Sequence, residues 1–116
     1  MAYKTEQIRN FVLCGHSGAG KTSTAEALLF NMNKINRLGR IADGTTVSDY
    51  DKDEIERQMS VKMSLLNGVW KDHQFNILDT PGYADFIAEA KGALRVADNA
   101  VVLVDAATGV EIGTER

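Results

Sequence analysis

The pattern of apolar and polar positions along the chain predicts four strands. Residues 8–14 (IRNFVLC) form a short apolar run that stops at a glycine, as a buried parallel strand would. Residues 100–105 (AVVLVD) are apolar and rich in valine, which is typical of a strand buried on both sides. Residues 61–70 and 75–78 are predicted to be two more strands, joined by a turn at 71–73.

Apolar residues at helical spacing predict two helices, at 21–33 and 83–97. The polar, acidic stretch 38–59 has little to bury, so we expect it to be mobile, with a solvated helix over 48–57. Strands that alternate with helices through right-handed crossovers predict an α/β fold, a three-layer sandwich with a mainly parallel sheet. Ligands of such a fold bind at the carboxyl ends of its strands.

Composition adds limits rather than a function. The 116 residues suit one small domain, and 13 basic against 16 acidic side chains exclude a chain-wide basic surface for DNA or a membrane. Cys14 is the single cysteine, so no disulfide forms within the chain and we expect a packed thiol. No apolar run approaches the length of a membrane span or a signal peptide, so the expected location is cytoplasmic.

Residues 15–22 (GHSGAGKT) match the pattern G-x-x-x-x-G-K-[ST], placed after a predicted strand and before a predicted helix. The glycines let the backbone fold into a nest whose amides, with the helix N-terminus, attract phosphates. Lysine at the seventh position reaches the β and γ phosphates, and the next hydroxyl ligates Mg²⁺. We therefore predict a nucleoside triphosphate site with these phosphate-binding residues: Gly15, His16, Ser17, Gly18, Ala19, Gly20, Lys21 and Thr22.

A second motif, DTPG at 79–82, follows the third predicted strand. Asp79 is expected to hold Mg²⁺ through water, and the Gly82 amide to contact the γ phosphate. Thr80 and Pro81 complete the predicted nucleotide-binding turn. Alone, Asp-Thr-Pro-Gly is also a common turn sequence, but after a phosphate loop and at a strand end it becomes specific.

A hydroxyl from the polar stretch is expected to join Thr22 and Asp79 at the metal. Ser60, just before the second predicted strand, is the best placed, with Thr45 and Thr46 as alternatives. Such a loop orders over the metal when a γ phosphate is bound.

Four segments carry a resemblance to one family: GHSGAGKT, DGTTVSDYDKDEIERQMSV, DTPGYADF and ALRVADNAVVLVDAATGVE. The chain resembles the GTP-binding domain of translational GTPases of the elongation factor G family, most closely its elongation factor G-like branch. The resemblance covers about residues 7–115. It implies a Ras-like P-loop fold, GTP or GDP and Mg²⁺ as cofactors, GTP hydrolysis, and the ribosome as partner.

The resemblance also implies that residues 1–116 are the N-terminal half of that domain, truncated before the Asn-Lys-x-Asp and Ser-Ala elements that recognise guanine. We expect such a fragment to be inactive or very weak. Its sheet edge would be uncovered, so we also expect it to self-associate.

Four positions depart from the family pattern. Tyr83 stands where ribosomal translocases carry the histidine that positions the attacking water, and tyrosine is a poor proton acceptor at neutral pH. Lys21 and Tyr83 are thus the catalytic candidates, with slow hydrolysis expected. Gly18 replaces an aspartate, which puts activation by a monovalent cation in doubt. Ser60 replaces a threonine and keeps the hydroxyl, but Gln58 replaces a glycine, so the loop is expected to close differently.

Two other functions stay open. A nucleotide-gated binding module would hold GTP and hydrolyse it barely at all, which Tyr83 favours. An adenine-nucleotide enzyme such as a small kinase would also need a phosphate loop, but the DTPG turn and the lack of an arginine cluster after residue 82 argue against it.

Overall fold

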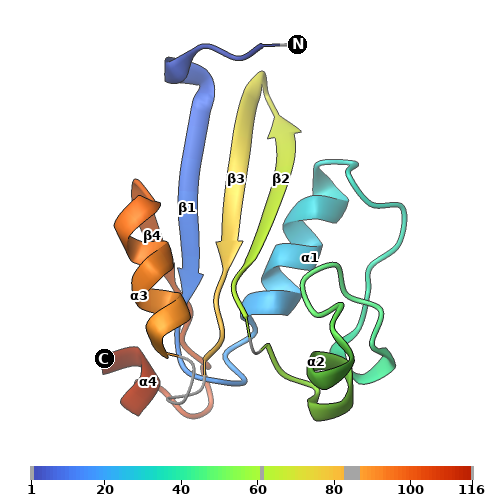
Figure 1. Ribbon diagram of the computed structural model, residues 1–116, viewed down its shortest axis with the longest axis vertical. Helices are drawn as coiled ribbons and strands as arrows, with labels where there is room; N and C mark the ends of the chain where they lie inside the picture. The colour runs from blue at the N-terminus through green and yellow to red at the C-terminus, as the bar shows by residue number, and fades with distance from the viewer. Residues whose placement is uncertain (1, 61, 83–86, 116) are drawn as a thin grey trace.

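The computed structural model describes residues 2–60, 62–82 and 87–115. Its sheet has the strand order β2-β3-β1-β4 (Figure 1). The strands are β1 (Ile8–Cys14), β2 (Ser64–Trp70), β3 (His73–Asp79) and β4 (Asn99–Val102). β1 runs parallel to both β3 and β4, whereas β2 and β3 form an antiparallel hairpin. The predicted α/β fold with a mainly parallel sheet is therefore confirmed.

The two longer helices lie on opposite faces of this sheet, and the two short ones lie near the end toward which β1 and β3 point (Figure 1). They are α1 (Lys21–Asn31), α2 (Lys52–Arg57), α3 (Ile87–Val96) and α4 (Ile112–Glu115), with 3₁₀ turns η1 (Thr5–Gln7) and η2 (Ile41–Asp43). Neighbouring residues of a strand point to opposite faces, so each strand feeds two cores.

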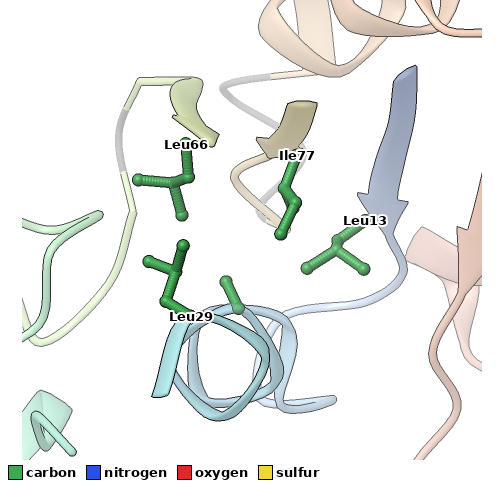
Figure 2. Close-up of a cluster of buried hydrophobic side chains, with 5 residues drawn as sticks. Leu13, Leu29, Leu66 and Ile77 are labelled. Carbon is green, nitrogen blue, oxygen red and sulfur yellow. The ribbon is translucent and has the colours of Figure 1, made fainter. Parts of the chain in front are cut away.

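The larger core lies between the sheet and α1. It consists of Leu13, Ala25, Leu29, Leu66 and Ile77, and Figure 2 shows its leucines and isoleucine pointing toward one another. The smaller core, on the opposite face, joins Val12 and Leu78 to Ala93 of α3. These two cores make the molecule three layers thick and fix the carboxyl ends of β1 and β3 side by side.

The hairpin between β2 and β3 has a two-residue turn, because Trp70 pairs directly with His73. Lys71 and Asp72 both have positive φ, 47° and 62°, as a turn that follows the twist of the strands requires. The two predicted strands and the turn between them are thus confirmed, but the turn is shorter than predicted, since His73 and Gln74 belong to β3.

The expectation for the last strand is wrong in one respect. β4 spans Asn99–Val102 and is an edge strand, so Val101 and Val102 are 44% and 53% exposed instead of buried on both sides. A local run of valines predicts a strand, but burial depends on neighbours that the run does not specify. In the described part of the chain β4 pairs only with β1.

The expectation that 38–59 has little to bury is also wrong. Four polar side chains of this stretch are buried: Thr46, Ser48, Asp49 and Glu54. Glu26 of α1 anchors the stretch, since its carboxylate accepts the Gly39 N–H at 3.0 Å and the Val47 N–H at 2.5 Å. The predicted helix over 48–57 is shortened to α2. Mobility of the stretch stays a prediction.

Candidate functional site

The loop between β1 and α1 has the backbone that the glycine spacing predicts. Gly15, Gly18 and Gly20 have positive φ of 144°, 79° and 95°. Two features exclude a side chain at Gly15: its positive φ, and the Leu103 carbonyl oxygen, which would lie 2.4 Å from an added Cβ. The loop leads into α1, whose first residue is Lys21. Such a turn before a helix N-terminus is a ready site for anions.

Lys21 lies inside this loop and is 6% exposed. Its Nζ donates hydrogen bonds to the carbonyls of Gly15 at 3.0 Å and His16 at 2.8 Å. Burial lowers the pKa of Lys21, and this effect is opposed by Asp79 and Cys14. The ammonium group is thus held at the loop where phosphate oxygens would need it.

The three predicted metal ligands come together at the carboxyl ends of β1 and β3. The Thr22 hydroxyl donates to Asp79 Oδ2 at 2.7 Å across 57 residues of sequence. The Ser60 hydroxyl lies 3.1 Å from that of Thr22. Their role as ligands stays a prediction, but their meeting at one point is a property of the fold.

The two alternatives to Ser60 are occupied elsewhere. Thr45 Oγ1 accepts the Arg40 N–H at 3.0 Å, and Thr46 Oγ1 accepts the Asp49 N–H at 3.3 Å. Both hydroxyls therefore hold the polar stretch in shape, whereas Ser60 faces Thr22.

Asp49 is a site residue that the sequence did not single out. It is 3% exposed, and its Oδ1 accepts the Ser60 hydroxyl at 2.6 Å. Burial raises its pKa; the Ser60 hydrogen bond lowers it, and Glu54 and Glu26 raise it further. It lies in the acidic segment SDYDKDE, where no pattern distinguishes one carboxylate from its neighbours.

The Asp79 carboxyl resembles that of Asp49, since it is buried and its pKa is raised. Its burial raises the pKa, the Thr22 and Ser48 hydroxyls lower it, Asp49 raises it and Lys21 lowers it. The Ser48 hydroxyl interacts with the Asp79 carboxyl. Three buried oxygens, Ser48 Oγ, Asp79 Oδ1 and Asp49 Oδ2, nevertheless have no hydrogen bond of normal geometry within the described residues. Two buried carboxylates with spare oxygens are suited to a cation.

These oxygen donors fit Mg²⁺ rather than a transition metal. Among the residues that the structure describes, no three histidine, cysteine or carboxylate side chains form a metal cluster. Magnesium keeps several waters and takes one or two carboxylates plus phosphate oxygens, so hydroxyls with Asp79 and Asp49 suffice. Thr22 and Ser60, with Asp79 through water, would hold the ion, and Asp49 would bind another of its waters.

A cavity of about 230 Å³ opens over this cluster. Its walls come from the phosphate loop and the start of α1, from the DTPG turn and from residues 58–60, with Ile41 and Asp49 of the polar stretch. They include Ser17, Gly18, Gly20, Lys21, Thr22, Asp49, Gln58, Ser60, Thr80 and Gly82. Ala19 and His16 support the loop from within, where the Ala19 N–H donates to the His16 carbonyl at 3.2 Å.

The DTPG turn lies directly against the phosphate loop. A Cβ added to Gly82 would lie 2.5 Å from Lys21 Nζ and 2.6 Å from the Ser17 nitrogen. The Thr80 hydroxyl donates to the Leu13 carbonyl at 2.7 Å and so joins the ends of β3 and β1. Pro81 is buried in the same turn. Tyr83, the other catalytic candidate, lies outside the described residues.

Comparison with known proteins points to one family. The model of the elongation factor Tu GTP-binding domain matches residues 6–116. Over 113 residues the chain is 42% identical to elongation factor G of Petrotoga mobilis, covering 97% of this chain and 16% of that protein. It is 41% identical to mitochondrial ribosome-releasing factor 2 of Candida dubliniensis, covering 97% of this chain and 14% of that protein. The chain thus spans a small part of these relatives.

Solved structures agree. A crystal structure of a protein from Thermus thermophilus matches with a TM-score of 0.92 and 42% identity, over 95% of this chain and 17% of that one. A bacterial selenocysteine-specific elongation factor shares the fold, with a TM-score of 0.71 and 23% identity over 99% of this chain and 17% of its own. The resemblance to translational GTPases, read from the motifs, is confirmed: the chain belongs to the family of the elongation factor Tu GTP-binding domain.

Proposed function

We propose that this chain binds GTP and GDP with Mg²⁺ as part of a translation factor that acts on the ribosome and hydrolyses GTP. The observation that carries the proposal is the meeting of Thr22, Asp79 and Ser60 at the mouth of the phosphate loop. The relatives named elongation factor G and ribosome-releasing factor 2 support a ribosomal partner. No helix in the described ranges has the length and hydropathy to span a bilayer. A cytoplasmic location and the absence of a DNA or membrane partner belong to the proposal.

The residues divide the work by their chemistry. Lys21 and the amides of 15–20 bind the β and γ phosphates, and the Gly82 amide, lying against Ser17, receives the γ phosphate. Thr22 and Ser60 present hydroxyls to the ion, and Asp79 and Asp49 hold its waters in place. Bound Mg²⁺ supplies charge neutralisation at the phosphates. Thr80 keeps the two strand ends together while this happens.

Nucleotide binding by the full-length protein tests the proposal. We expect fluorescent GDP to be displaced by GTP and GDP but not by ATP, with Mg²⁺ required for tight binding. Lys21→Ala removes charge-assisted hydrogen bonds to phosphate and should weaken binding by about 100-fold. Displacement by ATP as effective as by GTP would reject a guanine-specific site and favour the adenine-nucleotide alternative.

A second candidate is a nucleotide-gated binding module with little hydrolysis, favoured by Tyr83. Tyrosine has a pKa near 10, so it positions water through a hydrogen bond without accepting a proton. Single-turnover GTP cleavage with ribosomes separates the two functions. If Tyr83 limits the rate, Tyr83→His should speed cleavage by about tenfold and Tyr83→Phe should slow it by at least that factor. A smaller loss in Tyr83→Phe with no gain in Tyr83→His would refute this role.

A further inference from the structure

The His16 side chain, in the phosphate loop, is held by a segment 95 to 97 residues further along the chain. Its Nε2 lies 3.0 Å from Glu111 Oε2, and its Nδ1 accepts the Gly113 N–H at 3.1 Å. Because Nδ1 accepts, this hydrogen-bond pattern assigns the ring proton to Nε2, where it points at the Glu111 carboxylate. Both ring nitrogens are therefore engaged by residues 111–113.

The contact also involves the main chain. An added Cβ on Gly113 would lie 2.6 Å from His16 Nδ1 and 2.9 Å from its Cα. Gly113 has no tolerance for a side chain here, so the start of α4 packs directly on the phosphate loop. In Figure 1 α4 lies at the end of the molecule toward which β1 and β3 point.

Two threonines also hold Glu111 in place, independently of His16. Its Oε1 accepts the Thr108 hydroxyl at 2.5 Å, and its N–H donates to Thr114 Oγ1 at 3.4 Å. Thr108 and Thr114 thus fix the carboxylate and the backbone that present Glu111.

His16 is also held on its other side. Its carbonyl accepts Lys21 Nζ at 2.8 Å and the Ala19 N–H at 3.2 Å. The carbonyl is therefore fixed from inside the loop and the ring from outside. A nest of amides attracts an anion only while successive N–H groups keep their direction. A loop that is ordered beforehand loses less conformational entropy when a phosphate binds.

We propose that Glu111 is a positioning residue of the phosphate loop: through His16 it holds the loop in the conformation that binds phosphate and so slows release of the nucleotide. The inference rests on the proposed function, since it needs a nucleotide at this loop. It concerns how long the nucleotide stays, not which base is recognised. Neither Glu111 nor Gly113 lines the cavity, so their effect acts through His16.

The test is the dissociation rate of a fluorescent GDP from the full-length protein, measured by stopped flow with Mg²⁺. Glu111→Ala is expected to raise this rate about fivefold. Glu111→Gln keeps an oxygen that can accept the His16 Nε2–H, so its rate should stay within twofold of the original protein. Glu115→Ala removes an exposed carboxylate from α4, the helix that directly follows Glu111, and should change nothing.

A double-mutant cycle shows whether Glu111 acts through His16. His16→Ala should raise the dissociation rate by a similar factor, and adding Glu111→Ala to it should have no further effect. Multiplying effects in the double variant would overturn the inference, because they would mean a general structural role for Glu111. So would an unchanged rate in Glu111→Ala while the original protein binds GDP normally. If the original protein fails to bind GDP with Mg²⁺, the proposed function fails and this inference with it.

Discussion

The Asp79 carboxyl is nearly removed from solvent, and burial is the main reason that its pKa lies above the ordinary value. A group whose pKa is raised by folding binds its proton more tightly in the folded state. Its unfavourable effect on stability is therefore absent below the unfolded pKa and grows as pH rises toward and through the folded pKa. In the absence of a cation, Asp79 therefore opposes folding at neutral pH.

Asp79→Asn should thus have opposite effects on stability and on binding. Without Mg²⁺, at neutral pH, we expect the variant to unfold at a temperature several degrees higher, which corresponds to a free energy of unfolding raised by about 1 kcal/mol. The reason is that the asparagine side chain has no ionisation that burial opposes, while Thr22 keeps an acceptor. Nucleotide binding with Mg²⁺ should weaken about tenfold or more. Thermal unfolding in EDTA at pH 4 and pH 7 is the measurement, and the stabilisation should shrink at pH 4. Destabilisation at pH 7 would contradict this account.

Gly82 allows a test of how closely the DTPG turn must approach the phosphate loop. Its added Cβ would meet Lys21 Nζ and the Ser17 nitrogen, so Gly82→Ala forces the DTPG turn away from the phosphate loop. We expect GTP affinity to fall by about tenfold or more, as the loss of one or more phosphate contacts implies. Gly92 in α3 is the matched control, because nothing lies within 4 Å of its added Cβ. Gly92→Ala should leave affinity unchanged and stabilise the helix by about 0.5–1 kcal/mol. Equal affinities in the two variants would rule out the close approach.

At the scale of elements, the stretch between α1 and β2 depends on one carboxylate of α1. Glu26 is 2% exposed and accepts the amides of Gly39 and Val47. Glu26→Gln keeps the shape but turns an NH₂ group toward one of these N–H donors. The partly buried donor that is left without an acceptor should cost about 1 kcal/mol.

The measurement is hydrogen exchange of the Gly39 and Val47 amides together with the unfolding free energy. Exchange should speed at both amides in Glu26→Gln, and residues 39–47 should loosen before the sheet does. Glu56→Gln changes an exposed carboxylate of α2 and serves as control. Exchange rates that stay equal in Glu26→Gln and Glu56→Gln would show that the stretch is held by something else.

The sequence predicts site residues that belong to contiguous motifs, but not those that depend on contacts between segments far apart in the chain. GHSGAGKT and DTPG predicted the meeting of Thr22 and Asp79, because parallel strands bring their carboxyl ends together. Asp49 was missed because its acidic neighbours have the same composition. The pairing of His16 with Glu111 leaves no signal in spacing, since the fold alone brings them together.

At the scale of the whole molecule, the sheet has an apolar edge. β4 pairs only with β1 within the described residues, and Val101 and Val102 on it are about half exposed, as is Val104 just beyond it. An unpaired strand edge offers N–H and C=O groups to another strand, and apolar side chains add burial. We therefore expect the 116-residue chain to self-associate through β4.

Val102→Lys tests this expectation, since a lysine on an edge strand opposes pairing with a second copy. Sedimentation velocity over a range of concentrations should show the original chain as dimers or larger species and Val102→Lys shifted to monomer. Val96→Lys makes the same change on α3, at a side chain that is 65% exposed and off the sheet edge, so it should associate as the original chain does. Equal loss of association in both variants would mean that added charge alone is responsible. A stable monomer of the original chain at high concentration would mean that the β4 edge does not pair with a second copy, and would overturn the expectation.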